Sequence, residues 1–84
     1  MTKLKLTEID GDKKCRVVAF EGGSNMKTKL ENLGIRLGNE ITVVNNSFIG
    51  GPITVLSGNT KVAIGRKMAE RILVEVVKWK RYYY

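Results

Sequence analysis

The sequence contains no histidine among its 84 residues, and its only cysteine is Cys15. Histidine is the most common general base in enzymes and a preferred ligand of transition metals. Without histidine, and with one thiol, a single chain cannot build a closed tetrahedral zinc site from nitrogen and sulfur ligands. We therefore expect no catalytic residues, no metal ligands, no cofactor and no enzymatic activity.

Cys15 also excludes an intramolecular disulfide, which is typical of a chain from a reducing compartment. It precedes the apolar run 17–20, so we interpret it as a thiol on a strand. The alternative is a reactive thiol, favoured by the neighbouring cations Lys13, Lys14 and Arg16.

Long apolar runs are absent as well. No run approaches the roughly 20 residues that a membrane span requires. The lysines near the N-terminus are not followed by the apolar region of a signal peptide. We expect a cytoplasmic chain.

What the sequence does have is positive charge. The formal net charge is +7, and residues 57–84 carry +5 of it, seven cations minus two carboxylates. A basic C-terminal third favours an anionic partner, which can be nucleic acid, a phospholipid surface or an acidic protein face.

Short runs rich in Val, Ile and Thr predict five strands, and glycines separate them. The expected strands are Arg16–Phe20, Glu40–Asn46, Ile53–Leu56, Thr60–Ile64 and Ile72–Lys78. Gly58-Asn59 between two of these runs predicts a two-residue hairpin turn.

Residues 24–34 have helical spacing instead. Met26, Leu30 and Leu33 share one face at i, i+4 and i+7, which we expect to pack on the core. Ser24 is the expected N-cap, and Gly34 the expected left-handed residue after the helix. A short helical turn is expected over Arg66–Arg71.

This order predicts a mainly β protein: a small barrel of about five antiparallel strands, with one helix after the first strand and a helical turn before the last. We place the barrel in residues 1–77. Residues 78–84 form a separate basic and aromatic tail.

Three stretches carry a resemblance to a known family: Gly22-Gly23 followed by Lys29–Gly38, then Gly50–Ile53, then Gly58–Val74. Together, in this order and spacing, they resemble FeoA, the small cytosolic companion of the membrane ferrous-iron transporter FeoB. The resemblance runs from about Leu6 to Val76 and implies an SH3-like barrel. Related domains occur in iron-dependent transcription repressors, so the fold alone does not fix the function.

Two positions depart from the family pattern. Leu37 stands where the family often has proline, and Gly51 stands where it often has aspartate. The second change removes a carboxylate from the loop and weakens any expectation of a metal there.

The resemblance implies a non-catalytic adaptor or regulator that binds the cytosolic GTPase part of FeoB. The candidate contacts are basic or apolar residues expected at the surface: Lys27 and Lys29 on the helix, Phe48, Ile49, Gly50, Gly51 and Pro52 in the loop, and Arg66, Lys67 and Arg71 in the helical turn.

Alternatives stay open for both the barrel and the tail. A small basic barrel can bind single-stranded nucleic acid through aromatic stacking, or serve as a regulatory domain of a transcription repressor. The tail Lys78–Tyr84 can instead lie at an anionic membrane surface, or pack on another copy of the chain in a homo-oligomer. We expect nucleic-acid binding to be the weaker of these hypotheses, because the aromatic residues lie at a terminus.

Overall fold

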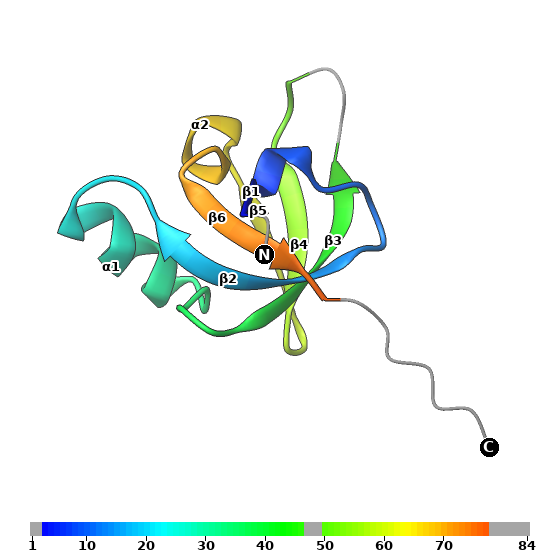
Figure 1. The fold of residues 1–84 in the computed structure, drawn as a ribbon, viewed down its shortest axis with the longest axis horizontal. Helices are drawn as coiled ribbons and strands as arrows, with labels where there is room; N and C mark the ends of the chain where they lie inside the picture. The colour runs from blue at the N-terminus through cyan, green and yellow to red at the C-terminus, as the bar shows by residue number, and fades with distance from the viewer. Residues whose placement is uncertain (1–2, 47–49, 78–84) are drawn as a thin grey trace.

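The computed structural model describes residues 3–46 and 50–77. Six antiparallel strands form one curled sheet in the order β1-β6-β2-β3-β4-β5 (Figure 1). The elements in chain order are β1 (Leu4–Lys5), the 3₁₀ turn η1 (Leu6–Glu8), β2 (Lys14–Phe20), α1 (Ser24–Asn32), β3 (Glu40–Asn46), β4 (Ile53–Ser57), β5 (Thr60–Ile64), α2 (Arg66–Ala69) and β6 (Ile72–Val76).

The predicted mainly β fold is confirmed, with six strands where about five were expected. The extra strand, β1, was missed because two residues are too few to show a period-2 pattern. The predicted hairpin is present, since Ser57 pairs with Thr60 across Gly58-Asn59. The last strand ends at Val76 rather than at residue 78.

Bulges curl the sheet. The register between β2 and β6 shifts between Val17 and Ala19, and that between β3 and β4 shifts between Val43 and Asn45. An extra residue on one strand bends it and increases its twist. The sheet consequently curls on itself (Figure 1), and the buried side chains of the described residues form one core cluster.

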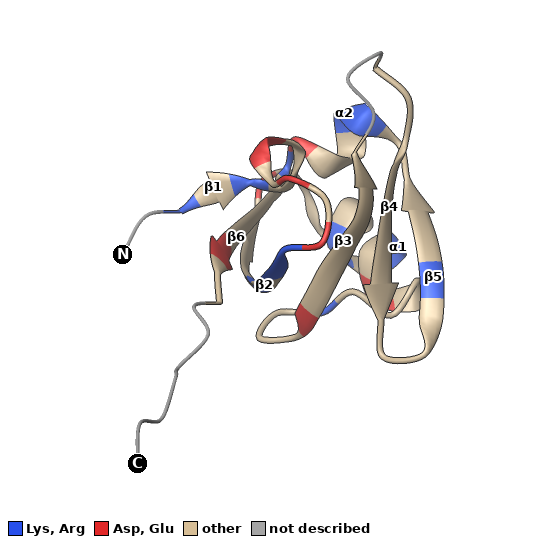
Figure 2. Cartoon of the chain, turned by 90° about the vertical axis from the view of Figure 1, so that its right-hand side faces the viewer, with Lys and Arg blue, Asp and Glu red and all other residues tan. Residues whose placement is uncertain are grey.

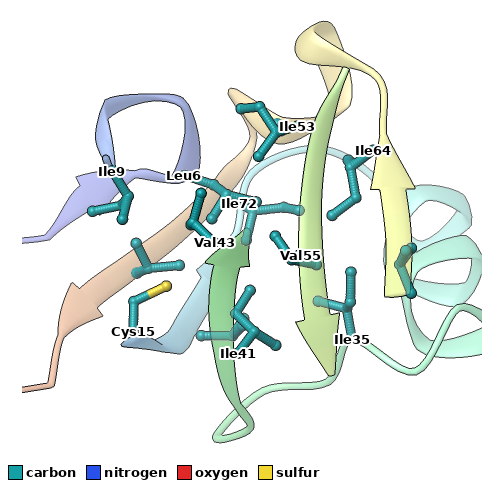
Figure 3. Packing of buried hydrophobic residues seen from close by; sticks show 14 of the residues in the cluster. Leu6, Ile9, Cys15, Ile35, Ile41, Val43, Ile53, Val55, Ile64 and Ile72 are labelled. Carbon is teal, nitrogen blue, oxygen red and sulfur yellow. The ribbon is translucent and has the colours of Figure 1, made fainter. Parts of the chain in front are cut away.

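The core is aliphatic. Side chains from β3 and β4, such as Ile41, Val43 and Val55, face Ile72 of β6 and Ile35 of the segment after α1 (Figure 3). Each such side chain contributes about 1.5–3 kcal/mol when fully buried. Among the described residues, every buried side chain is apolar.

The N-cap of helix α1 is one residue earlier than expected. Gly23 is the N-cap, Ser24 lies in the first turn, and no side chain caps the helix start. Leu30 is fully buried and Met26 is partly buried against the core. The expectation that Leu33 also packs inward is wrong, because it is the C-cap residue and is 44 % exposed.

The end of α1 is fixed as predicted. Gly34 has φ +91°, its N–H donates to the carbonyl of Glu31, and the N–H of Ile35 donates to the carbonyl of Leu30. These two bonds form a Schellman motif, which satisfies carbonyls that the helix leaves free. Ile35 then enters the core.

We expect Gly34→Ala to lower the free energy of unfolding by about 1–2 kcal/mol, because an L-residue is strained at this φ. Space is not the cause, since an added Cβ would lie 3.9 Å from the Ser57 hydroxyl. Urea unfolding measures the change. Gly11→Ala is the matched control: Gly11 has no left-handed φ, and its Cβ would meet the Val44 carbonyl at an ordinary 3.6 Å. Equal losses in the two variants would contradict the strain argument.

Asn46 links four segments at one end of the barrel. Its Nδ2 donates to the carbonyls of Thr7 at 3.1 Å and Ile9 at 2.7 Å. Its Oδ1 accepts from Arg66 Nη2 at 3.0 Å, and Arg66 Nε donates to the Gly51 carbonyl at 3.3 Å. The Asn46 amide thus joins β3 to the η1 segment and α2, and Arg66 extends the link to the segment before β4.

Replacing Asn46 by alanine should destabilise the fold by about 2–3 kcal/mol, because partly buried carbonyls lose their donor and Arg66 loses an acceptor. Thermal or urea unfolding provides the measurement. Asn45→Ala, at the exposed neighbouring position, should change the free energy of unfolding by no more than about 0.5 kcal/mol. If Asn46→Ala proves as mild as Asn45→Ala, the four-way link does not stabilise the barrel.

Candidate functional site

The structure separates the residues that the sequence singled out. Lys27 and Lys29 lie on α1, exposed to solvent. Gly50, Gly51 and Pro52 precede β4, and the Gly51 carbonyl accepts from Arg66 of α2. Lys67 is exposed beside Arg66, and Arg71 is exposed just before β6. Phe48 and Ile49, like the tail 78–84, lie outside the described residues, so their proposed roles stay predictions.

The side chain of Arg66, a candidate contact residue, also holds two segments of the fold together. It is half-buried and donates to Asn46 and to the Gly51 carbonyl, which holds the segment before β4 against α2. The structure thus places Gly51 of the loop beside the helical turn of Arg66, a proximity that the sequence analysis did not predict. Lys67 is the residue of this pair whose side chain is exposed.

A groove of about 310 Å³ lies between the second half of β2 and the start of α1. In Figure 1 α1 lies beside the end of β2. The groove lining comes from β2, from the turn into α1 with its first residues, and from the segment after α1: Val18, Ala19, Phe20, Gly22, Gly23, Ser24, Lys27 and Leu37. Leu37 is 47 % exposed, so the groove has an apolar side chain that is open to solvent.

A second cation, Arg71, lies against the turn at Gly22, which is one of the residues that line the groove. Gly22 has φ +120°, and a Cβ placed on it would lie 3.2 Å from Arg71 Nη1 and 3.2 Å from Met26 Sδ. The guanidinium of Arg71 therefore lies over the backbone of this turn. Lys27 lines the groove, whereas Arg71 lies beside its residue Gly22 and is not part of the lining.

The acidic residues of the sheet are engaged elsewhere. Arg16 is directly opposite Glu40 of β3 and Glu75 of β6. It forms 3.0 Å ion pairs with both carboxylates, and Lys14 reaches Glu40 at 3.5 Å. Hydrogen bonds to Glu40, and then to Glu75, raise the pKa of the Arg16 guanidinium. Figure 2 shows acidic positions on β3 and β6, and cations on α1, α2 and β5.

A second depression, of about 440 Å³, lies between η1 and α2. Its side chains carry both signs of charge, and two of them hold the fold together. Glu8 accepts from the Lys5 backbone N–H at 2.8 Å, and Arg66 bonds Asn46. We regard this depression as the seam between two packed segments, and the β2–α1 groove as the candidate site.

Metal ligation finds no support in the described part of the chain. Over residues 3–46 and 50–77, no three of His, Cys, Asp and Glu lie together as a metal ion would require. A search of the same ranges for membrane-crossing helices also finds no helix of sufficient length and apolarity.

Cys15 is fully buried in β2, as the strand interpretation predicted. Burial raises the pKa of its thiol from the ordinary value of 9.0 to about 11. A raised pKa keeps the thiol protonated near neutral pH, which is the reverse of what activates a nucleophilic cysteine. The alternative of a reactive thiol is therefore not supported.

The raised pKa predicts a loss of stability in alkali. Below pH 9 the thiol is neutral in both states, whereas between pH 9 and about 11 it ionises only in the unfolded chain. The free energy of unfolding should fall by about 2–3 kcal/mol across that interval from this group alone. Urea titrations at several pH values test this, and Cys15→Ala should show a correspondingly smaller fall. Parallel curves for the two proteins would contradict it.

Sequence reasoning missed the walls of the groove. It named Lys27 and Arg71 as basic surface residues, but it read Val18 and Phe20 as ordinary strand residues. Leu37 was noticed only as a departure from a family pattern. The sequence signal for this wall is Leu37 itself, which lies between Arg36 and Gly38. It belongs to no helical or strand pattern of apolar residues, so no such pattern predicts its burial.

The fold defines the class of protein: a small, mainly β, SH3-like domain whose polar chemistry lies at its surface. The chain matches the FeoA domain family over residues 4–76, and it belongs to that family. Membership implies a role in ferrous-iron transport.

Named relatives agree with the family. The chain is 30 % identical over 59 residues to a Methanocaldococcus jannaschii protein named "Putative Fe(2+) transport protein A", covering 70 % of each. It is similar to a crystal structure described as an iron uptake regulatory protein (FeoA), with TM-score 0.82, 31 % identity, 92 % of this chain covered and 100 % of that one. An NMR structure of a FeoA-like protein from Clostridium acetobutylicum gives TM-score 0.81 at 26 % identity, covering 100 % of this chain and 99 % of that one.

The fold is also shared with part of a larger protein. A manganese-dependent transcriptional repressor matches with TM-score 0.81 at 20 % identity, over 89 % of this chain and 42 % of that one. At this identity the likeness concerns the fold alone.

Proposed function

We propose that this chain is a non-catalytic, cytosolic regulator of ferrous-iron uptake that acts by binding the cytosolic GTPase part of the FeoB transporter. Family membership supports the ferrous-iron role. The observation that carries the binding role is the groove beside α1, where exposed apolar and basic side chains meet.

Three features favour binding at the surface over chemistry in the interior. The interior of the described residues is filled by apolar side chains, which leave no polar chamber. The thiol of Cys15 is enclosed among them. The carboxylates Glu40 and Glu75 are paired with Arg16 on the outer face. Lys27 and Leu37, which line the groove, are exposed and are therefore accessible to a partner.

In this proposal the tail Lys78–Tyr84, which lies outside the described residues, adds a second contact. A basic and aromatic segment is attracted to anionic lipid, by about 1 kcal/mol per Lys or Arg near the surface. Such attraction would keep the regulator close to a membrane transporter and raise its effective concentration there.

The full chain should bind the isolated cytosolic domain of FeoB from the same genome saturably, with a dissociation constant on the order of micromolar, as for many transient complexes. Isothermal titration near 150 mM salt measures this, and raising the salt should weaken binding because exposed charges are screened. Single-stranded oligonucleotide and anionic vesicles are the comparison ligands. Absence of binding to the FeoB domain, beside clear binding to oligonucleotide, would overturn the proposal.

A further inference from the structure

We propose that the β2–α1 groove binds an acidic segment of the partner protein by taking up one apolar side chain and pairing a neighbouring carboxylate with Lys27 and Arg71. This inference rests on the proposed function and adds the place and the chemistry of the contact. The occupant is a peptide segment of a partner, rather than a small molecule or a second copy of this chain.

The size and walls of the groove set the apolar part of the ligand. Its volume of about 310 Å³ is at the small end of the range of about 300–1,000 Å³ that ligand clefts occupy. Val18 and Phe20 of β2 provide apolar walls, and Leu37 stands half in solvent at the groove. A site of this size suits one leucine-sized or aromatic anchor, the kind of residue that dominates interface energies.

Strand β2 makes the groove a fixed surface. Its first half pairs with β3 over Lys14–Arg16, and the N–H of Val17 donates to the carbonyl of Asn39. Farther along, Ala19 and Phe20 pair with β6. The groove lies where β2 has left β3, so its floor is anchored by the sheet and needs little reordering on binding.

The charges around the groove set the polar part of the ligand. Lys27 is the charged residue of the lining, and the guanidinium of Arg71 lies over Gly22 at the same turn. The start of α1 has no side-chain cap, so its first backbone N–H groups add partial positive charge there. Glu21, in the same turn, is exposed and is not part of the lining. This arrangement is complementary to a carboxylate that flanks an apolar anchor.

Helix α1 and the segment after it offer matched pairs of variants for the test. Lys27 and Lys29 are both exposed on α1, and only Lys27 lines the groove. Leu37 and Leu33 are 47 % and 44 % exposed, and only Leu37 lines the groove. We expect Lys27→Glu and Leu37→Ser each to weaken binding about tenfold, as loss of an interface hot spot does. Lys29→Glu and Leu33→Ser should change it less than about twofold.

The titration uses the full chain with two probes. One is the cytosolic domain of FeoB; the other is a fluorescent ten-residue peptide of alternating glutamate and leucine, with the lysine–leucine peptide as its charge control. Anisotropy gives the dissociation constants, and amide chemical-shift changes give the location. The expected result is binding of the FeoB domain and of the acidic peptide, both weakened by the two groove variants alone, with shifts at residues 18–27 and 37.

The outcomes separate this inference from the proposed function. If the FeoB domain binds all variants equally, or shifts α2 and β5 instead, the groove is wrong and the proposed function stands. If the FeoB domain does not bind and the acidic peptide binds at the groove, the proposed function is wrong. The preference of the groove for an acidic ligand then stands. Loss of a dimer in Leu37→Ser would show that a second copy fills the groove, and that result overturns the inference. Should Leu37→Ser unfold, the charge-reversed pair Lys27→Glu and Lys29→Glu decides alone.

Discussion

Strand β2 is hydrogen-bonded to different neighbours along its length, and the rest of the structure follows from that division. Over Lys14–Arg16 it lies between β3 and β6, so Arg16 faces a carboxylate on each side. At Val17 it bonds the segment before β3, through Gly38 and Asn39, and after the register shift between Val17 and Ala19 it pairs with β6. The part of β2 that lines the groove, Val18–Phe20, thus lies beyond its pairing with β3.

The charged residues of the sheet pair with one another along the first half of β2. Where three strands lie side by side, Arg16 and Lys14 meet Glu40 and Glu75, and opposite charges cancel on the outer face. Exposed pairs of this kind contribute little to stability, typically below about 1 kcal/mol each. Their larger effect here is on the field of the protein: they occupy carboxylates on the sheet, so the cations of α1 and of the turn before β6 are left to face solvent.

How much the sequence predicted depends on which interactions form each element. The strands of five to seven residues, the β4–β5 hairpin and the Gly34 helix end follow from local patterns, and they are present. β1 and the bulge at Val18 follow from pairing with distant β6, which no local pattern reveals. Tertiary packing also explains where the sequence-based predictions are wrong. Leu33 has helical spacing with Leu30, but the Schellman turn makes Ile35 the residue that enters the core. The groove joins residues 18–27 to residue 37 through tertiary packing, so the sequence named its cations without showing that they meet.

The two ends of α1 are held differently, and this bears on how the groove can act. At the far end the carbonyl of Gly34 accepts from Asn39 at 3.1 Å and from Ser57 at 2.9 Å, which ties the helix to the start of β3 and the end of β4. At the near end an uncapped first turn follows Gly22, whose missing side chain leaves space for Arg71 and Met26. The C-terminal end of the helix is therefore held by side-chain hydrogen bonds, whereas its N-terminal end has no side-chain cap and presents the exposed Lys27 to a ligand. A site held by a sheet on one side and by an anchored helix on the other loses little conformational entropy on binding, so a few side chains of a partner are enough to give useful affinity.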